Sequence, residues 1–285
     1  MVISQFTAPS PPSRQGAGAA VDIVAIHDIY EDGIQTWTEP ISNILWLRDL
    51  LPESLRECRA LVYSYKAEAL TAPGLGSTDS ILANATSLVA ELCADRQLDN
   101  AFHRPIIFIC HGFGGILAKR ALSYSNSRRH KAVEHLRSIY TCTYGIIFMG
   151  TPHNGINKEA LLFQPHQNSG PNHFMISLLK GSEMLNEIND QFAPLMKQFS
   201  IYNFWEDLKT QSGDHDFYIV DQDSAAPAWD NVEKMNGSKR LKNCYDPNTA
   251  QFFKKIQPLQ TTINGASFLV NQAYTSLVGK STHGM

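Results

Sequence analysis

The sequence has few features that would suit a nucleic acid or a membrane. Its 24 basic and 27 acidic residues give a formal net charge of −3, and the two signs are mixed along the chain, so no basic surface for DNA or an anionic bilayer is predicted. No stretch reaches the roughly 18 apolar residues of a membrane span, and residues 1–20 lack the basic start and apolar run of a signal peptide. We therefore expect no nucleic acid partner, no membrane association and a cytoplasmic location.

Cysteine is also scarce, and its placement excludes two kinds of stabilisation. The odd number of cysteines argues against a disulfide framework, and the absence of Cys-x-x-Cys spacing argues against a zinc site. The glycines at 112, 114 and 115 lack the spacing of a dinucleotide fingerprint or a P-loop. The expectation is a reducing setting with no metal and no cofactor. The cysteines are Cys58, Cys93, Cys110, Cys142 and Cys244.

Apolar runs, in contrast, are frequent and regularly spaced. With 285 residues, 43% of them hydrophobic, the chain is long enough for one large core. Short buried-strand patterns alternate with helical spacing, and this order predicts an α/β fold with a parallel, doubly wound sheet whose site lies at the carboxyl ends of the strands. The expected strands are 21–27, 59–65, 106–110, 144–149, 199–206 and 217–221, and the expected helices are 44–51, 80–96, 116–124 and 249–258.

Composition also suggests how the chain is divided. Residues 1–20 are rich in Pro, Ser, Gly and Ala, which predicts a flexible tail, and 21–285 are expected to form a single domain. A polar stretch at 157–170 and an amphipathic helical pattern at 175–198 indicate a cap insertion over about 156–198. Alternatively, the apolar stripe of this segment packs on the sheet. Exposed apolar residues of a cap would support a homodimer.

The most informative stretch joins a strand, a sharp turn and a helix. It reads Ile106-Ile-Phe-Ile-Cys-His-Gly-Phe-Gly-Gly115, and it resembles the nucleophile elbow of α/β-hydrolases, usually Gly-x-Ser-x-Gly. From about Val21 to Pro258 the chain resembles the serine esterase/lipase-like group common in fungi. The motifs that carry this resemblance are His27-Asp-Ile-Tyr-Glu-Asp-Gly33, Thr36-Trp-Thr38, Trp46-Leu-Arg-Asp-Leu-Leu-Pro52, Tyr63-Ser-Tyr65, Gly145-Ile-Ile-Phe-Met-Gly-Thr-Pro-His-Asn-Gly155 and Trp205-Glu-Asp-Leu-Lys-Thr210. The resemblance implies an α/β-hydrolase fold with a helical cap.

Three departures from the family pattern concern the catalytic triad and the oxyanion hole. Gly112 stands at the nucleophile position, so the covalent acyl-enzyme route is closed at its first step. The segment Gly237–Tyr245, where the resemblance places the triad histidine, contains none, whereas the acid maps onto Glu206. Asp28 replaces the glycine beside the oxyanion hole, where a carboxylate opposes a developing negative charge. One lost residue could be an engineered inactivation, but three coordinated changes argue against it.

These departures leave three interpretations open. The first is a hydrolase fold converted to cyclisation, rearrangement or elimination on a small hydrophobic molecule, which resembles conversions known among plant and fungal natural-product enzymes of this fold. The second is a catalytically dead homologue that binds a ligand or a protein. The third is a hydrolase with an atypical nucleophile, such as a water activated by Asp28.

Several residues are candidates for the site because their loops converge at the carboxyl ends of the strands. Asp28 is the first choice as acid or base, unless backbone N–H groups satisfy it as an ordinary loop carboxylate. Gly112 would free space for a ligand and leave the amides of Phe113 and Gly114 to a carbonyl oxygen. The thiol of Cys110 is expected to be buried and inert. The expected catalytic residues are Asp28, Tyr30, Glu206 and His111, and the expected substrate-binding residues are His27, Gly112, Phe113, His153 and Trp205.

The alternatives for the other candidates are structural. Tyr30 would donate a hydrogen bond to a substrate carbonyl or be a rim aromatic. His111 and His153 occur in relatives that keep the triad, which favours structural support. Glu206, without its histidine, would take a substrate proton or pair with Lys239.

Overall fold

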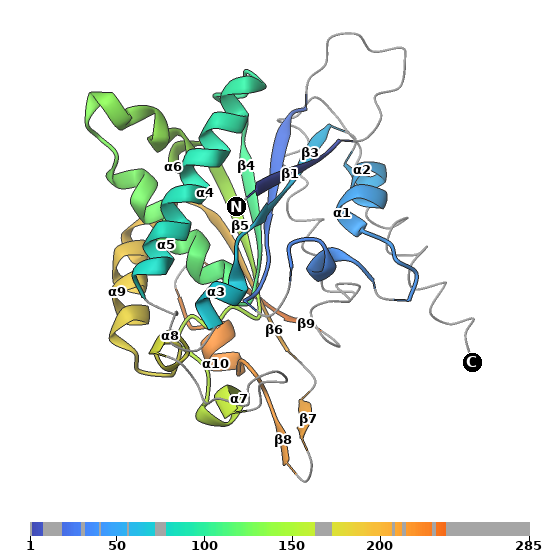
Figure 1. The fold of residues 1–285 in the computed structure, drawn as a ribbon, viewed down its shortest axis with the longest axis vertical. Helices are drawn as coiled ribbons and strands as arrows, with labels where there is room; N and C mark the ends of the chain where they lie inside the picture. The colour runs from blue at the N-terminus through green and yellow to red at the C-terminus, as the bar shows by residue number, and fades with distance from the viewer. Residues whose placement is uncertain are drawn as a thin grey trace.

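A mostly parallel seven-stranded sheet organises the molecule (Figure 1). The computed structural model describes residues 2–7, 19–29, 32–39, 41–55, 57–71, 78–162, 173–206, 209–212, 215–229 and 232–237. The strand order is β1-β3-β2-β4-β5-β6-β9, and only β1 runs antiparallel to its neighbour. The strands are β1 (Val2–Thr7), β2 (Val21–Ile26), β3 (Cys58–Ser64), β4 (Ile106–His111), β5 (Thr143–Met149), β6 (Ser200–Glu206) and β9 (Val232–Gly237).

Helices cover both faces of this sheet, as expected for a doubly wound fold. One face carries α4, α5, α6 and α9, whereas α1 and α2 lie on the other (Figure 1). The helices are α1 (Trp46–Asp49), α2 (Leu51–Ser54), α3 (Ala67–Thr71), α4 (Asp79–Leu98), α5 (Gly114–Ser127), α6 (Ser138–Cys142), α7 (Lys158–Leu162), α8 (His173–Ile176), α9 (Glu183–Phe192) and α10 (Gln222–Ala225). The 3₁₀ helices are η1 (Gln35–Trp37), η2 (Lys131–Arg137) and η3 (Ala193–Gln198).

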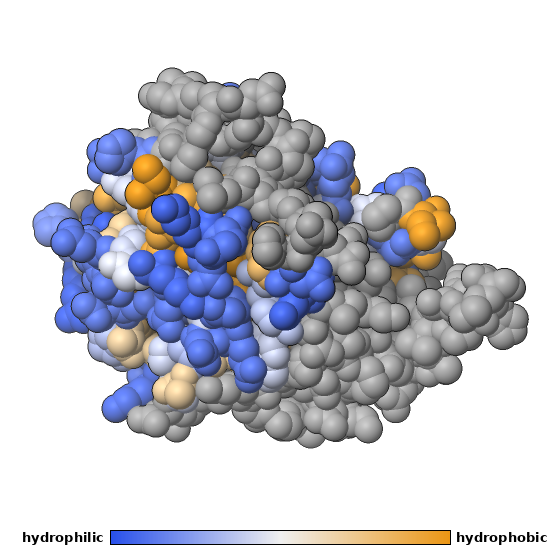
Figure 2. Space-filling view, turned by 90° about the horizontal axis from the view of Figure 1, so that it is seen from below, coloured by the Kyte–Doolittle hydropathy of each residue, from blue (hydrophilic) through white to orange (hydrophobic). Residues whose placement is uncertain are grey.

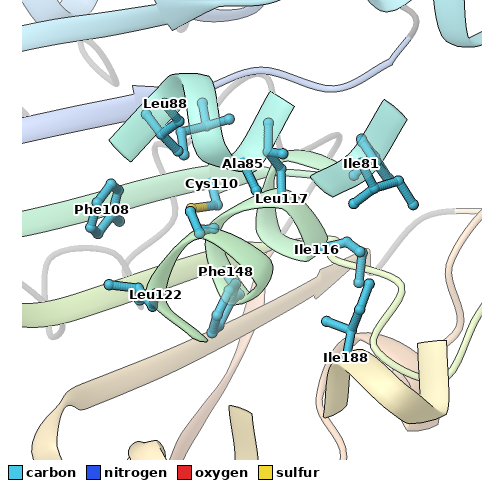
Figure 3. Packing of buried hydrophobic residues seen from close by; sticks show 14 of the residues in the cluster. Ile81, Ala85, Leu88, Phe108, Cys110, Ile116, Leu117, Leu122, Phe148 and Ile188 are labelled. Carbon is cyan, nitrogen blue, oxygen red and sulfur yellow. The ribbon is translucent and has the colours of Figure 1, made fainter. Parts of the chain in front are cut away.

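The central strands have side chains buried on both faces, which is why their sequences are nearly continuous apolar runs. Along β4, Phe108 and Cys110 point into the larger core cluster, and Ile107 and Ile109 point into the smaller one. Figure 3 shows the larger cluster, where side chains of α4, α5 and α9 meet those of the strands. They include Ile81, Ala85, Leu88, Phe108, Cys110, Ile116, Leu117, Leu122, Phe148 and Ile188.

A charged cluster lies at the amino-terminal end of the strands, opposite the elbow. Asp22 of β2 is fully buried and pairs with three arginines. Arg59 makes two hydrogen bonds with its carboxylate, at 2.8 and 3.1 Å. Arg96 and Arg104 complete the set. Since one partner comes from each of β3, α4 and the approach to β4, this cluster joins four segments of the chain.

The structure contradicts the prediction of a flexible tail for part of residues 1–20. Val2–Thr7 form β1, which pairs with β3 in an antiparallel register from Val2↔Ser64 to Thr7↔Arg59. The β-branched and aromatic residues of this segment suit a strand, and the Pro- and Ser-rich composition of the following residues masked that signal. Residues 8–18 lie outside the described part of the chain.

The prediction of a sheet strand at 217–221 was also wrong. Phe217–Asp221 is not a strand of the sheet, because β8 (His215–Phe217) ends there after pairing with β7 (Thr210–Ser212) in a hairpin. Asp221 then caps α10 by accepting the amide of Ser224. The next strand of the sheet is β9, whose polar sequence is typical of an edge. The helix expected at 249–258 lies outside the described residues.

The interval 156–198, expected to form a cap, contains α7, α8, α9 and η3. Its apolar stripe packs largely against the sheet side: Ile188 and Phe192 of α9 belong to the larger core cluster, as does Leu195. Ile176, in contrast, is 48% exposed. The alternative that most of the stripe is core is therefore confirmed for α9. None of the helices in the described ranges combines the length and apolar character that crossing a membrane requires.

Candidate functional site

The elbow between β4 and α5 has the geometry that the sequence predicts. Gly112 has φ +51°, a left-handed conformation that glycine adopts without strain. A Cβ on Gly114 would lie 2.5 Å from the backbone oxygen of Ile26, and one on Gly115 would lie 2.1 Å from Oγ1 of Thr151. Glycine is thus required at both positions for α5 to approach the sheet so closely.

Asp28 fills the space that a nucleophile would occupy at this elbow. A Cβ built on Gly112 would lie 2.3 Å from both Cγ and Oδ1 of Asp28. The amide of Phe113 donates a hydrogen bond of 2.8 Å to the same Oδ1. The prediction that Gly112 frees space for a ligand was therefore wrong, as was the prediction that the Phe113 amide is available to a carbonyl oxygen. One backbone N–H therefore satisfies one oxygen of this carboxylate, and a role of Asp28 as acid or base stays a prediction.

Glu206 ends β6 and is the second carboxyl group of the site. The pKa of Glu206 is raised to about 7, chiefly by burial; a hydrogen bond from the Ile219 amide opposes this rise, and the charge of Asp28 contributes to it. Oε2 of Glu206 is buried and has no hydrogen-bond partner among the described residues. A carboxyl group that is partly protonated at neutral pH therefore lies within electrostatic reach of the Asp28 side chain.

For the remaining candidates at this edge of the sheet, the structure gives the position in the strand and the burial. His111 ends β4 opposite Met149 of β5 and is half-buried, and Trp205 is half-buried next to Glu206. Tyr30 and Lys239 lie outside the described residues. Figure 2 shows this side of the molecule from below, where described hydrophilic residues predominate around a smaller hydrophobic group. Among the described residues, no three His, Cys, Asp or Glu side chains gather in a way that could hold a metal ion.

Comparison with known proteins adds an independent line of evidence. No protein-family model matches the chain. Protein SERAC1 of Bos taurus is 25% identical over 242 residues, which are 75% of this chain and 35% of that protein. Protein SERAC1 of Homo sapiens is 30% identical over 119 residues, which are 39% of this chain and 16% of that protein. The chain thus spans little more than a third of the first relative's length.

A solved structure matches over nearly the whole chain. It is the mature lipase BlEst2 of Bacillus licheniformis, with a TM-score of 0.54 and 15% identity, covering 90% of this chain and 97% of the lipase. The chain has the α/β-hydrolase fold. At this identity the match concerns the fold alone, and function has to be argued from the site.

Within the α/β-hydrolase fold, two predicted substrate-binding residues are instead part of the interior. The His27 ring is 1% exposed and stacks on Tyr65. Its Nε2 accepts the Tyr65 amide at 3.2 Å, so Nδ1 donates to the Asp28 carbonyl oxygen at 2.7 Å. The Phe113 ring is 1% exposed and packs against Phe174. Both residues position Asp28 and the Phe113 amide, and their side chains do not line the site.

His153 is likewise enclosed, in a polar cluster behind the elbow that sequence reasoning missed. Lys119 of α5 is fully buried and lies 3.0 Å from Nδ1 of His153, and it also contacts Asn189 of α9. Burial lowers the pKa of Lys119 to about 7. Burial and then the Lys119 charge lower the pKa of His153. This placement contradicts substrate contact by His153 and agrees with structural support. The signal in the sequence was a lysine, Lys119, on the apolar face of a helix.

Cys110 also takes the position that the sequence predicts for it. Its side chain is fully buried in the larger core cluster, and burial raises the pKa of its thiol far above the usual range. A thiol that stays protonated is a poor nucleophile. Cys110 therefore does not replace the missing serine.

Proposed function

We propose that this chain is a non-hydrolytic enzyme of the α/β-hydrolase fold, related to the serine esterase/lipase-like group. It acts without a cofactor on a small hydrophobic molecule, in a cyclisation, rearrangement or elimination. The observation that carries the proposal is the carboxyl pair at the elbow. Burial raises the pKa of Glu206 to about 7, so this group holds a proton part of the time at neutral pH, and the Asp28 carboxyl group lies close enough to act on it electrostatically. A proton donor and a proton acceptor in one site provide an acid and a base.

In this proposal Asp28 takes a proton from the substrate and Glu206 supplies one. The Asp28 carbonyl oxygen is anchored by His27 and its Oδ1 by the Phe113 amide. The Phe113 hydrogen bond reduces the rotation of the side chain, and the His27 hydrogen bond fixes the backbone that carries it. Orientation of a base is a large part of its effect. Serine-type hydrolysis is opposed because Asp28 occupies both the nucleophile's space and an amide of the oxyanion hole.

The proposal is tested with 5-nitrobenzisoxazole, whose elimination needs only a base and an apolar surrounding. The base removes a carbon-bound proton, the N–O bond breaks, and a phenolate absorbs visible light. We expect measurable turnover by the wild-type chain and a loss of about 100-fold in Asp28→Asn. Asp32→Asn is the matched control, because Asp32 is an exposed carboxylate of the same loop that accepts the Ile34 and Gln35 amides. Equal rates in all three proteins would show that Asp28 takes no part in the reaction.

The second candidate function is a binding module without chemistry. It is favoured by the same filled elbow, since a carboxylate in the nucleophile's place blocks the original reaction. A native mass spectrum of the protein taken from its source distinguishes the two. A retained small molecule that wild type converts, and Asp28→Asn does not, supports the enzyme. A retained protein partner together with no turnover of the elimination probe supports the module.

A further inference from the structure

Each carboxyl group of the site has one oxygen that the fold leaves for a proton transfer. In Asp28, Oδ1 accepts the Phe113 amide at 2.8 Å, and within the described ranges it is the one hydrogen-bonded oxygen of this side chain. The other oxygen, Oδ2, also lies at the elbow, 2.8 Å from where a Cβ on Gly112 would stand. In Glu206, Oε2 is buried and has no hydrogen-bond partner among the described residues. A proton can therefore pass to Oδ2 and from Oε2.

From this arrangement we propose that the substrate class is a hydrophobic β,γ-unsaturated ketone, whose carbon–carbon double bond is moved into conjugation with the carbonyl group. The inference rests on the acid–base pair of the proposed function and narrows its rearrangement to a proton shift. In the first step Oδ2 of Asp28 takes the α-proton, and the electron pair of the C–H bond forms a double bond to the carbonyl carbon. The carbonyl π electrons move to the oxygen, which receives the proton of Glu206. The products are a dienol, a protonated Asp28 and an ionised Glu206.

The second step returns both protons and restores the site. Glu206 takes the proton of the dienol hydroxyl group, and the electron pair of that O–H bond forms the carbonyl group again. The double bond between the carbonyl carbon and the α-carbon shifts to lie between the α- and β-carbons. The electrons of the former β,γ double bond take the proton of Asp28 at the γ-carbon. The α,β-unsaturated ketone leaves, and no water, oxidant or second substrate is consumed, as a non-hydrolytic reaction requires.

The strength of the base and the presence of the acid decide the substrate class. A carboxylate is a weak base, and the α-proton of a β,γ-unsaturated ketone is more acidic than that of a simple ketone because both the carbonyl group and the double bond activate it. Removal of this proton places negative charge on the carbonyl oxygen, which a neighbouring protonated carboxyl group neutralises. Since the pKa of Glu206 is about 7, this group can both give the proton and take it back near neutral pH.

The residues next to the pair suit a hydrophobic ketone. Ile29 follows Asp28, and Trp205 precedes Glu206; both pack on the larger core cluster. Ile219, whose amide is a hydrogen-bond donor to Glu206, has a side chain that is 40% exposed. An apolar surrounding also strengthens the electrostatic action of the two carboxyl groups on the reacting atoms.

The test follows the conversion of cyclohex-3-enone to cyclohex-2-enone by ultraviolet absorbance. Wild type is expected to accelerate this conversion above its rate in buffer alone, and Asp28→Asn is expected to lose about 100-fold or more in kcat. Glu206→Gln keeps a hydrogen-bond donor but cannot release a proton, so a loss of about tenfold is expected. Asp32→Asn, which changes an exposed carboxylate of the same loop as Asp28, is expected to behave as wild type.

The pH dependence distinguishes an acid from a residue that only supports the fold. Asp28 is the ionisable group that acts electrostatically on Glu206, and the Ile219 amide is its hydrogen-bond donor. The wild-type kcat should fall by about tenfold between about pH 6 and about pH 9, as Glu206 loses its proton, and approach that of Glu206→Gln. The kcat of Glu206→Gln should stay level over this range. A parallel fall in both proteins would show that Glu206 is not the acid.

Other outcomes would overturn the remaining parts of the inference. Equal rates of ketone conversion in wild type and Asp28→Asn would show that Asp28 is not the base. Absence of ketone conversion, combined with turnover of 5-nitrobenzisoxazole that Asp28→Asn loses, would refute the substrate class while the proposed acid–base function stands. Absence of reaction with both probes would refute both. Circular dichroism of each variant verifies that the fold is kept.

Discussion

Asp28 and Gly112 are mutually dependent, since the Asp28 carboxylate lies where a Cβ at position 112 would have to be. The overlap is severe, with 2.3 Å between the built Cβ and both Cγ and Oδ1 of Asp28. The two departures from the esterase pattern are therefore one structural change. A carboxylate entered the elbow where the serine side chain was absent, and it took the Phe113 amide for itself.

This dependence predicts the effect of restoring a serine. Gly112→Ser forces the Asp28 carboxylate to rotate away from the Phe113 amide and places a side chain in a left-handed conformation. We expect a loss of about 1–3 kcal/mol in the free energy of unfolding. In the Asp28→Gly background the same substitution is expected to lose less, because the overlap is gone. Urea denaturation of the four proteins of this double-mutant cycle measures the coupling. Additive losses would contradict the steric relationship.

Glu206 predicts a pH dependence of stability with a defined sign. Its pKa is raised to about 7 in the folded protein, above its ordinary value of 4.5, so the folded state binds more protons than the unfolded state between these values. Stability should therefore fall as pH rises from about 5 to about 7, by roughly 1 kcal/mol after allowance for partial exposure. The Glu206→Gln variant should lack this fall. Urea midpoints of the two proteins across this range provide the comparison, and parallel curves would show that Glu206 is ionised throughout.

The burial of Lys119 predicts a pH dependence of stability with the opposite sign, in a higher pH range. Its pKa is lowered from 10.5 to about 7 by burial, so between these values the unfolded state binds the extra proton. Stability should rise with pH, on the order of 2 kcal/mol between about pH 7 and about pH 9, relative to Lys119→Met. The difference in unfolding free energy between the two proteins measures it. A constant difference would mean that Lys119 stays charged inside the fold.

The sheet and the elbow were predictable from sequence, but the contents of the elbow were not. Strands buried on both faces, such as β4, leave an apolar run that is visible in one dimension, and closely packed glycines mark the turn. The Asp28–Phe113 hydrogen bond joins residues 85 positions apart, and no local pattern encodes that contact. The burial of Lys119 depends in the same way on Asn189 and His153. β1 was missed because it is short and borders a stretch rich in Pro and Ser.

The charged cluster opposite the elbow predicts a large effect on stability. Among the described residues, Asp22 is the one carboxylate that contacts all three arginines of the cluster. Asp22→Asn leaves the buried Arg96 without a carboxylate, whereas Arg59 and Arg104 keep ion pairs with other aspartates. We expect a loss of about 3–5 kcal/mol in the free energy of unfolding. Glu187→Gln is the control, because Glu187 is 61% exposed and 3.4 Å from Arg120, and it should change little. A loss no greater than that of the control would show that the cluster is not a major source of stability.

The central claim is that the pKa of Glu206 is raised to about 7 by burial and by the neighbouring Asp28 side chain. The most direct measurement is a carbon-13 NMR titration of protein labelled at the glutamate carboxyl carbon, with the Glu206 signal identified by its absence from Glu206→Gln. The account predicts a Glu206 midpoint near pH 7 that moves to lower pH in Asp28→Asn, where one negative charge is removed. A midpoint in the ordinary range for glutamate, unchanged in Asp28→Asn, would contradict it.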